Sequence, residues 1–77
     1  MEIRVKLFNE LQRYKQGERN VFPVELEPGS CVDNLLTKLQ IPRTAARITL
    51  VNGRRADEKT QLCSGDTVVF FSPVAGG

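Results

Sequence analysis

Apolar residues alternate with charged ones at the start of the chain, where Ile3, Val5 and Leu7 lie two positions apart. A period of two is typical of a strand that buries one face, so this stretch predicts a first strand. Residues 21–26 repeat the spacing and predict a second strand. Pro23 favours the edge of the sheet for this strand, because proline has no N–H to donate to a neighbour.

The residues between these strands favour a short helix over 10–16, with Asn9 as its N-cap. Leu11 and Tyr14 fall on one face of this helix, and Gly17 suits the left-handed position that often follows a helix. About two turns of helix are marginal in water, so we expect contacts with the rest of the protein to stabilise it.

The strongest helical pattern begins after the turn residues 27–29. The spacing i, i+3, i+4, i+7 is met by four apolar residues, Val32, Leu35, Leu36 and Leu39. Ser30 and Asp33 resemble a capping box at the start of this helix, and Pro42 is expected to end it. We expect the apolar stripe to cover a sheet. Its alternative use as a partner-binding face would deprive a small chain of its main source of core.

The second half of the chain predicts three more strands. Residues 48–51 and 54–56 flank Asn52-Gly53, a pair that favours a tight turn because both positions tolerate positive φ. A polar loop follows, in which Leu62 is expected to point inward, and residues 67–71 predict the last strand.

The last strand has no polar alternation. This is typical either of a strand buried on both faces or of one that exposes an apolar side to a partner. Phe70 and Phe71 must point to opposite faces, so one is expected in the core and the other at the surface. The sequence does not decide which is which. For the exposed ring, contact with a partner and local packing are equally good expectations.

The order strand, short helix, strand, long helix, strand, short strand, strand predicts an α+β fold. One main helix across a small mixed sheet, with the first and last strands parallel at its centre, is the β-grasp (ubiquitin-like) plan. A chain of 77 residues supports one modest core, so residues 1–77 are expected to form a single domain.

The charge of the chain is close to balanced, with 11 Lys and Arg against 9 Asp and Glu. A net charge of +2 does not indicate nucleic-acid binding. Residues 43–56 contain four arginines and no acid, and this segment is either a solvated basic face or a docking surface for an acidic partner. A β-grasp module that binds RNA through these arginines is an alternative, which the absence of a stacking pattern among the aromatic residues disfavours.

No apolar run approaches the length of about 20 residues that crosses a membrane. The first residues alternate charged and apolar types and lack the apolar block of a signal peptide. We therefore expect a cytoplasmic protein without membrane contact.

The chain has no histidine, and its two cysteines, Cys31 and Cys63, lie far apart in sequence. Zinc sites need about four ligands, usually clustered in pairs, so we expect no metal site and no bound cofactor. The two thiols also lack a histidine that would activate them as nucleophiles. We expect both to be buried free thiols in a reducing compartment, with a disulfide between them as the alternative.

The remaining candidate for chemistry is the carboxylate at the end of the chain, on Gly77. Gly76 and Gly77 carry no side chain that would obstruct a narrow channel in a partner. Pro73 stiffens the point where the tail leaves the sheet, because its ring fixes φ. We therefore expect a flexible tail over about 72–77 that presents this carboxylate to another protein.

The run from Gly65 to Gly77 resembles the C-terminal signature of the MoaD/ThiS sulfur-carrier family, closest to its molybdopterin synthase small-subunit branch. That signature is Gly-Asp, a hydrophobic strand with an aromatic residue, two prolines, Val, a small residue and Gly-Gly. Residues 5–8, 27–36 and 51–53 are also similar to the family. Ser72 stands where the signature has its first proline, which is expected to loosen the exit of the tail.

The resemblance implies a protein cosubstrate and not an enzyme. A ubiquitin-activating-type enzyme would use ATP to adenylate Gly77, and sulfur would then replace the adenylate to give a thiocarboxylate. In the molybdopterin branch the tail would enter the large subunit of molybdopterin synthase, which passes the sulfur to a pterin precursor. The partner-binding residues of the tail would be Phe71, Pro73, Val74, Ala75 and Gly76.

Three alternatives share the fold. In the thiamin branch of the family the sulfur goes to a thiazole. The predicted helix over 10–16 and the Pro73-Val74 pair favour the molybdopterin branch over it. A ubiquitin-like modifier would use the same activation but join Gly77 to lysines of other proteins. A plain interaction module would not need the tail.

Overall fold

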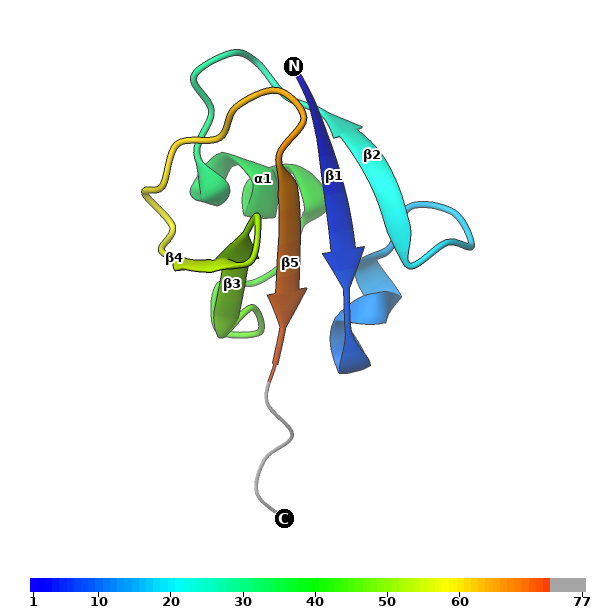
Figure 1. Ribbon diagram of the computed structural model, residues 1–77. Helices are drawn as coiled ribbons and strands as arrows, with labels where there is room; N and C mark the ends of the chain where they lie inside the picture. The colour runs from blue at the N-terminus through cyan, green and yellow to red at the C-terminus, as the bar shows by residue number, and fades with distance from the viewer. Residues whose placement is uncertain (73–77) are drawn as a thin grey trace.

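The computed structural model describes residues 1–72, which form a five-stranded mixed sheet and one α-helix (Figure 1). In chain order the elements are β1 (Glu2–Leu7), the 3₁₀ helix η1 (Asn9–Tyr14), β2 (Val21–Glu25), α1 (Val32–Leu39), β3 (Ile48–Val51), β4 (Arg54–Ala56) and β5 (Thr67–Phe71). The predicted order of strands and helices is confirmed.

The sheet has the strand order β2-β1-β5-β3-β4, with β1 and β5 parallel at its centre. The other neighbouring strands are antiparallel. Pro23 lies in β2, which is an edge strand, as its missing N–H predicted. One helix across a mixed sheet whose first and last strands pair in parallel is the β-grasp fold, so the predicted ubiquitin-like architecture is confirmed.

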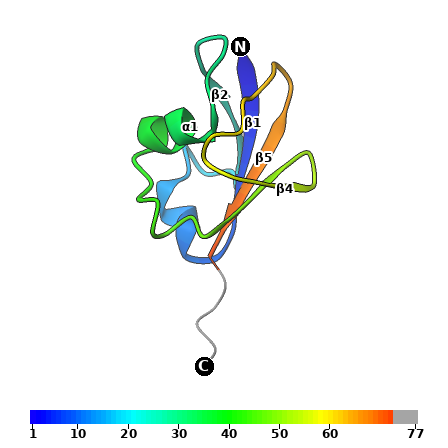
Figure 2. The same ribbon diagram turned by 90° about the vertical axis from the view of Figure 1, so that its left-hand side faces the viewer.

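The core lies between α1 and one face of the sheet (Figure 2). All four positions of the predicted helical stripe are buried: Val32, Leu35, Leu36 and Leu39. From the sheet, alternate residues of β1 point toward α1, and β5 contributes Val68 and Phe70. Phe70 has no exposed surface, which identifies it as the core member of the Phe70-Phe71 pair.

The start of α1 differs from the prediction by one residue. The N-cap is Cys31, whose backbone N–H donates to Asn34 Oδ1 at 2.8 Å. The Ser30 hydroxyl donates instead to the carbonyl of Glu27 at 2.7 Å. The prediction of Ser30 as the N-cap is wrong, because its hydroxyl closes the preceding turn. The capping box predicted for Ser30 and Asp33 is formed one position later, by Cys31 and Asn34.

The end of α1 also comes earlier than Pro42 requires. Gln40 takes a left-handed conformation with φ of 60°, and the N–H of Ile41 donates to the carbonyl of Leu36 at 2.9 Å. A left-handed residue followed by such a bond satisfies the last carbonyls of a helix. The helix therefore ends through its own C-cap, before proline could interrupt it.

The predicted short helix is present, but it is a 3₁₀ helix that ends at Tyr14. Asn9 is its first residue and not its N-cap, and it has a φ of 55°. Gly17 has positive φ as expected, although it does not directly follow the helix. Leu11 is 1% exposed, so contact with the core stabilises this short element.

The predicted tight turn joins β3 and β4, and Asn52 and Gly53 have φ of 52° and 84°. The Asn52 side chain also reaches the turn before β5. Its Nδ2 donates to Asp66 Oδ1 at 2.9 Å, and its Oδ1 accepts from the N–H of Thr67 at 3.0 Å. The hairpin is thereby joined to the start of the central strand β5.

We predict that Phe70→Ala lowers the free energy of unfolding by about 3–5 kcal/mol, because it removes a fully buried ring and leaves a cavity. Chemical denaturation followed by circular dichroism measures this loss. Val69→Ala, at the next position and on the opposite face, is the control and should cost clearly less. Equal losses for the two variants would contradict this assignment of the two faces of β5.

Candidate functional site

The face of the sheet opposite α1 is not covered by a helix within residues 1–72 (Figure 2). We call it the open face. The term refers to six of the side chains that the strand register places there: Lys6, Ile48, Leu50, Arg55, Val69 and Phe71. Apolar residues left on an uncovered sheet face are a typical feature of a protein-binding surface.

The strand register orders the open face. Val69 of β5 pairs with Lys6 of β1 on one side and with Leu50 of β3 on the other. Arg55 of β4 lies opposite Leu50. The row therefore has an apolar centre at Val69 and Leu50, with Arg55 at one end and Lys6 on the other side. Beyond Lys6 the row ends at the exposed Val21 of β2. Val69 and Leu50 are only partly buried, so β5 exposes an apolar side and is not buried on both faces.

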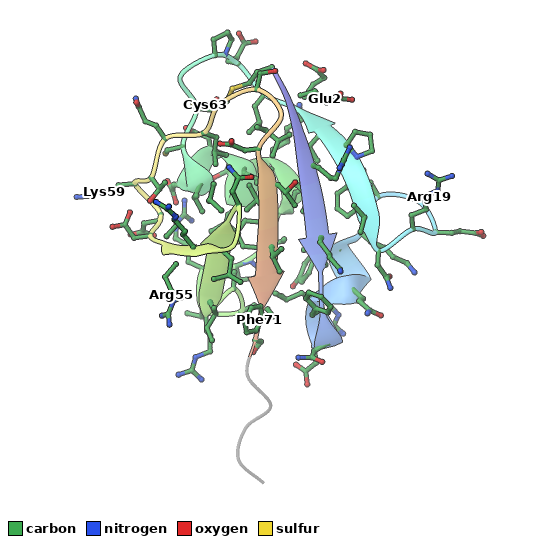
Figure 3. The ribbon with its side chains drawn as sticks, in the orientation of Figure 1. Glu2, Arg19, Arg55, Lys59, Cys63 and Phe71 are labelled. Atoms are coloured by element: carbon green, nitrogen blue, oxygen red, sulfur yellow. The ribbon has the colours of Figure 1, made fainter. Side chains whose placement is uncertain are left out.

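The end of β5 carries Phe71 (labelled in Figure 3), which is half-buried and packs against Phe8. The two rings are edge to face, with centroids 6.2 Å apart and an interplanar angle of 87°. Lys6 Nζ lies 4.9 Å from the centroid of the Phe8 ring. Phe71 is thus the surface member of the phenylalanine pair. It lies at the end of β5, as the predicted strand over 67–71 requires, and its role in partner binding stays a prediction.

Ser72 is the last residue described and is half-buried. Its carbonyl accepts a hydrogen bond from Asn9 Nδ2 at 3.2 Å. The sequence predicts Asn9 only as a helix cap, and no local signal indicates its contact with Ser72. The predicted tail residues Pro73, Val74, Ala75, Gly76 and Gly77 lie outside the described residues, and their roles stay predictions.

The four arginines of residues 43–56 do not form one surface. Arg43 contacts Asp33 of α1 and also Glu58, with 3.5 Å between Arg43 Nε and Glu58 Oε2. It therefore joins the helix to the loop before β5. The others are exposed, and Arg55 alone among them belongs to the open face as defined.

Both cysteines are free thiols. Cys31 is half-buried at the start of α1, and Cys63 is exposed. The prediction of two buried thiols is wrong for Cys63. This residue lies in the turn before β5, where its backbone N–H donates to Asp66 Oδ2 at 2.8 Å and its side chain faces outward.

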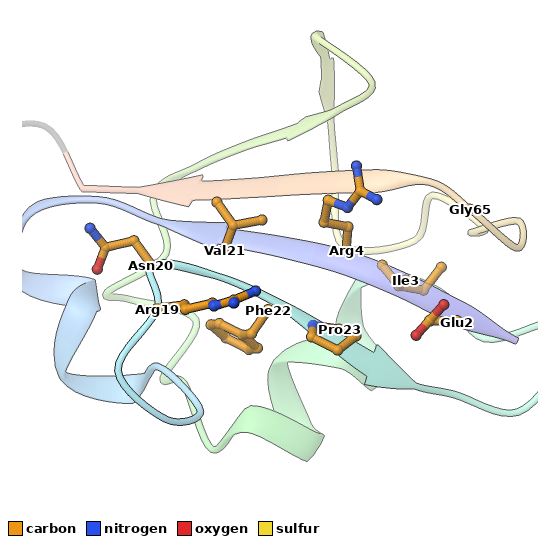
Figure 4. A pocket seen from close by; sticks show the side chains of 9 residues that line it. All are labelled: Glu2, Ile3, Arg4, Arg19, Asn20, Val21, Phe22, Pro23 and Gly65. Carbon is orange, nitrogen blue, oxygen red and sulfur yellow. The ribbon is translucent and has the colours of Figure 1, made fainter.

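Among residues 1–72, no group of three or more potential His, Cys, Asp or Glu ligands could hold a metal ion. A groove over β1 and β2 has Arg4, Arg19 and Pro23 in its lining, and no lining residue is a cysteine or a serine (Figure 4). In Figure 4 Arg4 and Phe22 extend to opposite sides of the sheet. The lining of the groove is charged in part but holds no thiol or hydroxyl nucleophile.

None of the helices in the described part of the chain is long and apolar enough to cross a membrane.

We predict that Phe8 and Phe71 are energetically coupled. A double-mutant cycle of Phe8→Ala and Phe71→Ala, measured by denaturant unfolding, should give a coupling free energy of about 0.5–1.5 kcal/mol, as edge-to-face aromatic pairs do. Strictly additive losses would show that the rings do not stabilise each other in solution.

The chain matches one protein family in sequence and several solved structures in fold. Residues 5–77 match the ThiS family. SAMP1 from Haloferax volcanii is 22% identical over 100% of both chains, with a TM-score of 0.76. A putative molybdopterin converting factor subunit 1 from Pyrococcus furiosus is 22% identical over 95% of this chain and 98% of its own, with a TM-score of 0.73.

A complex of subunits 1 and 2 of a molybdopterin-converting factor from Helicobacter pylori contains a chain that is 20% identical over 100% of both chains, with a TM-score of 0.64. At these identities the solved structures establish a shared fold. A search of curated protein sequences found no match.

Proposed function

The chain belongs to the ThiS family, and we propose that it is a sulfur-carrier protein in which Gly77 carries the sulfur as a thiocarboxylate. It takes part in the reaction as a protein cosubstrate and is not itself an enzyme. The family match over residues 5–77 supports this function.

The proposed chemistry takes place in two steps on a partner. A carboxylate oxygen of Gly77 attacks the α-phosphorus of ATP and releases pyrophosphate, which gives an acyl-adenylate. A sulfur nucleophile then attacks the carbonyl carbon and releases AMP, which leaves sulfur where oxygen was. The activating enzyme binds the ATP, and the carrier supplies the acceptor group. We propose that the reaction takes place in the cytoplasm, where ATP and reduced sulfur are available.

The structural support for the proposal comes from the open face. Its apolar centre at Val69 and Leu50 continues along β5 to Phe71, after which the chain leads into the tail. A partner that covers this face is therefore placed to receive the residues that follow Ser72. We propose this face as the docking surface for the adenylating enzyme and for the large subunit that takes the sulfur.

The charges beside the apolar centre indicate the character of the partner. Lys6 and Arg55 lie on either side of the apolar centre in the row that passes through Val69. Basic residues around an apolar patch favour a partner with acidic residues at the matching positions, which raises the rate of association more than the affinity.

We propose molybdopterin synthesis as the pathway that receives the sulfur. Support comes from the fold shared with chains named as molybdopterin-converting factor subunit 1, one of them in complex with subunit 2. The sequence adds Pro73-Val74 in the tail, and η1 occupies the connection between β1 and β2 in which thiamin carriers tend to be shorter. Transfer of the sulfur to a thiazole is the alternative within the family.

The second candidate is a ubiquitin-like modifier. The fold shared with SAMP1, whose name stands for small archaeal modifier protein 1, favours it, and a modifier would need the same activation of Gly77. A carrier and a modifier differ in the fate of the activated glycine. The carrier exchanges AMP for sulfur, whereas the modifier forms an amide with a lysine of another protein.

We expect intact-mass analysis to find one oxygen replaced by sulfur after incubation with ATP, the cognate activating enzyme and a sulfide source. Fragmentation should locate the change at Gly77. Deletion of Gly77 is the matched control and should abolish the change without altering the thermal stability of residues 1–72. An unchanged mass of the intact chain, with an enzyme that releases pyrophosphate in its presence, would contradict the carrier. Covalent adducts on lysines would support the modifier.

We expect Val69→Glu to weaken binding to the activating enzyme at least tenfold, because it places a charge at the apolar centre of the open face. Titration calorimetry or surface plasmon resonance measures the dissociation constant. Gln40→Glu adds the same charge at the end of α1, outside the open face, and should leave it unchanged. Equal effects of both variants would indicate a response to net charge and not to docking on this face.

A further inference from the structure

We propose that Asn9 is a positioning residue that fixes the direction in which the chain leaves β5. The inference rests on the proposed function, because a fixed direction matters when the residues that follow must enter a partner. It starts from the hydrogen bond that Asn9 Nδ2 donates to the Ser72 carbonyl at 3.2 Å.

Successive contacts with Phe8 and Asn9 guide the end of β5. The N–H of Phe8 donates to the carbonyl of Phe70 at 3.2 Å, and the Phe8 ring packs against the ring of Phe71. The side chain of Asn9 then holds the carbonyl of Ser72. The strand is thus held at three consecutive residues, first by backbone, then by an aromatic ring, then by an amide.

The regular pairing of β5 ends before Ser72 on both sides. The register with β1 ends at Leu7 and Phe70, and the register with β3 ends at Ile48 and Phe71. Ser72 therefore lies one position past the sheet. The contact from Asn9 extends the constraint on the backbone to this residue.

Asn9 can hold Ser72 because its own backbone is fixed. The N–H of Leu11 donates to the carbonyl of Phe8 at 3.1 Å, and the Leu11 side chain is almost completely buried. Asn9 itself has a φ of 55°, a left-handed conformation that asparagine tolerates better than most residues. The amide is therefore presented from a turn that is anchored in the core.

The direction of the chain at Ser72 matters most when a partner holds the residues that follow in an extended form. Five residues follow Ser72, and an extended chain of that length reaches about 17 Å. For a tail held extended in a partner's channel, a deviation of about 20° at its base would displace the far end by about 6 Å on that reach. Ser72 is not a proline, so no ring fixes its φ. The hydrogen bond from Asn9 supplies by contact part of the restriction that a proline ring supplies covalently.

The test compares Asn9→Gly and Asn9→Asp with Asn52→Gly. Glycine accepts the left-handed backbone and removes the amide, and aspartate keeps the shape but has no N–H to donate. Asn52 is a matched control. It is also left-handed and hydrogen-bonded through its side chain, but to Asp66 and Thr67 at the other end of β5.

The first measurement is NMR relaxation of the Ser72 amide and the chemical shift of the Ser72 carbonyl carbon, in the isolated full chain. Both Asn9 variants should lower the order parameter of Ser72 and shift its carbonyl resonance, whereas Asn52→Gly should change neither. Unchanged values in both Asn9 variants would overturn the proposal. This measurement needs no partner, so it decides the contact even if the carrier function fails.

The second measurement is the steady-state rate of adenylation by the cognate activating enzyme. An exposed hydrogen bond between neutral groups shifts an equilibrium between about two- and tenfold, so kcat should fall by that factor in the Asn9 variants. KM should stay constant, because the open face is intact. A raised KM with unchanged kcat would make Asn9 a docking contact and overturn a positioning role. If the unsubstituted chain is not adenylated, the proposed function fails, and the NMR result still stands.

Discussion

The structure depends on the parallel pairing of β1 with β5. These strands come from opposite ends of the described chain and lie together at the centre of the sheet, where they bury Val5, Val68 and Phe70 completely. Parallel neighbours end at the same edge of a sheet. For that reason the two residues that follow β1 lie beside the end of β5. Phe8 contacts Phe71, the last residue of β5, and Asn9 contacts Ser72. An antiparallel pairing would have placed them at opposite ends.

The second constraint is that one helix covers one face. The apolar stripe of α1 is used fully in the core, so the described chain has no second stripe of that kind for the other side of the sheet. Val69 and Leu50 stay partly exposed there with Lys6 and Arg55 beside them. A protein of this size can be stable with such a face. A partner that covered it would bury apolar surface that folding leaves in contact with water.

The fold and the proposed chemistry are separate in this protein. Among residues 1–72, no group of three or more His, Cys, Asp or Glu residues could hold a metal ion, and Thr49 is the one buried polar residue. Residues 30–34 and 63–67 instead show polar side chains that close turns and cap α1, such as Asn34 and Asp66. Under the proposed function, the folded part holds the base of the tail and the catalytic groups belong to the partner.

The sequence determined most of the fold, because its signals are local. The period of two in β1 and β2, the helical stripe of α1 and the Asn52-Gly53 turn each depend on residues a few positions apart, and each was found where predicted. The N-cap of α1 was predicted one residue early. Ser30 is the better N-cap by residue type, but its hydroxyl bonds to Glu27 in the preceding turn, and the helix begins after Cys31.

Only the tertiary structure decided which phenylalanine faces the core and what Asn9 binds. Phe70 and Phe71 are identical in type and adjacent, so their faces depend on which side of β5 the helix covers. Asn9 and Ser72 are separated by 63 positions, and nothing in either local sequence indicates the other. Contacts of this kind exist only after β1 and β5 have paired, because the pairing alone brings the two ends of the strands together.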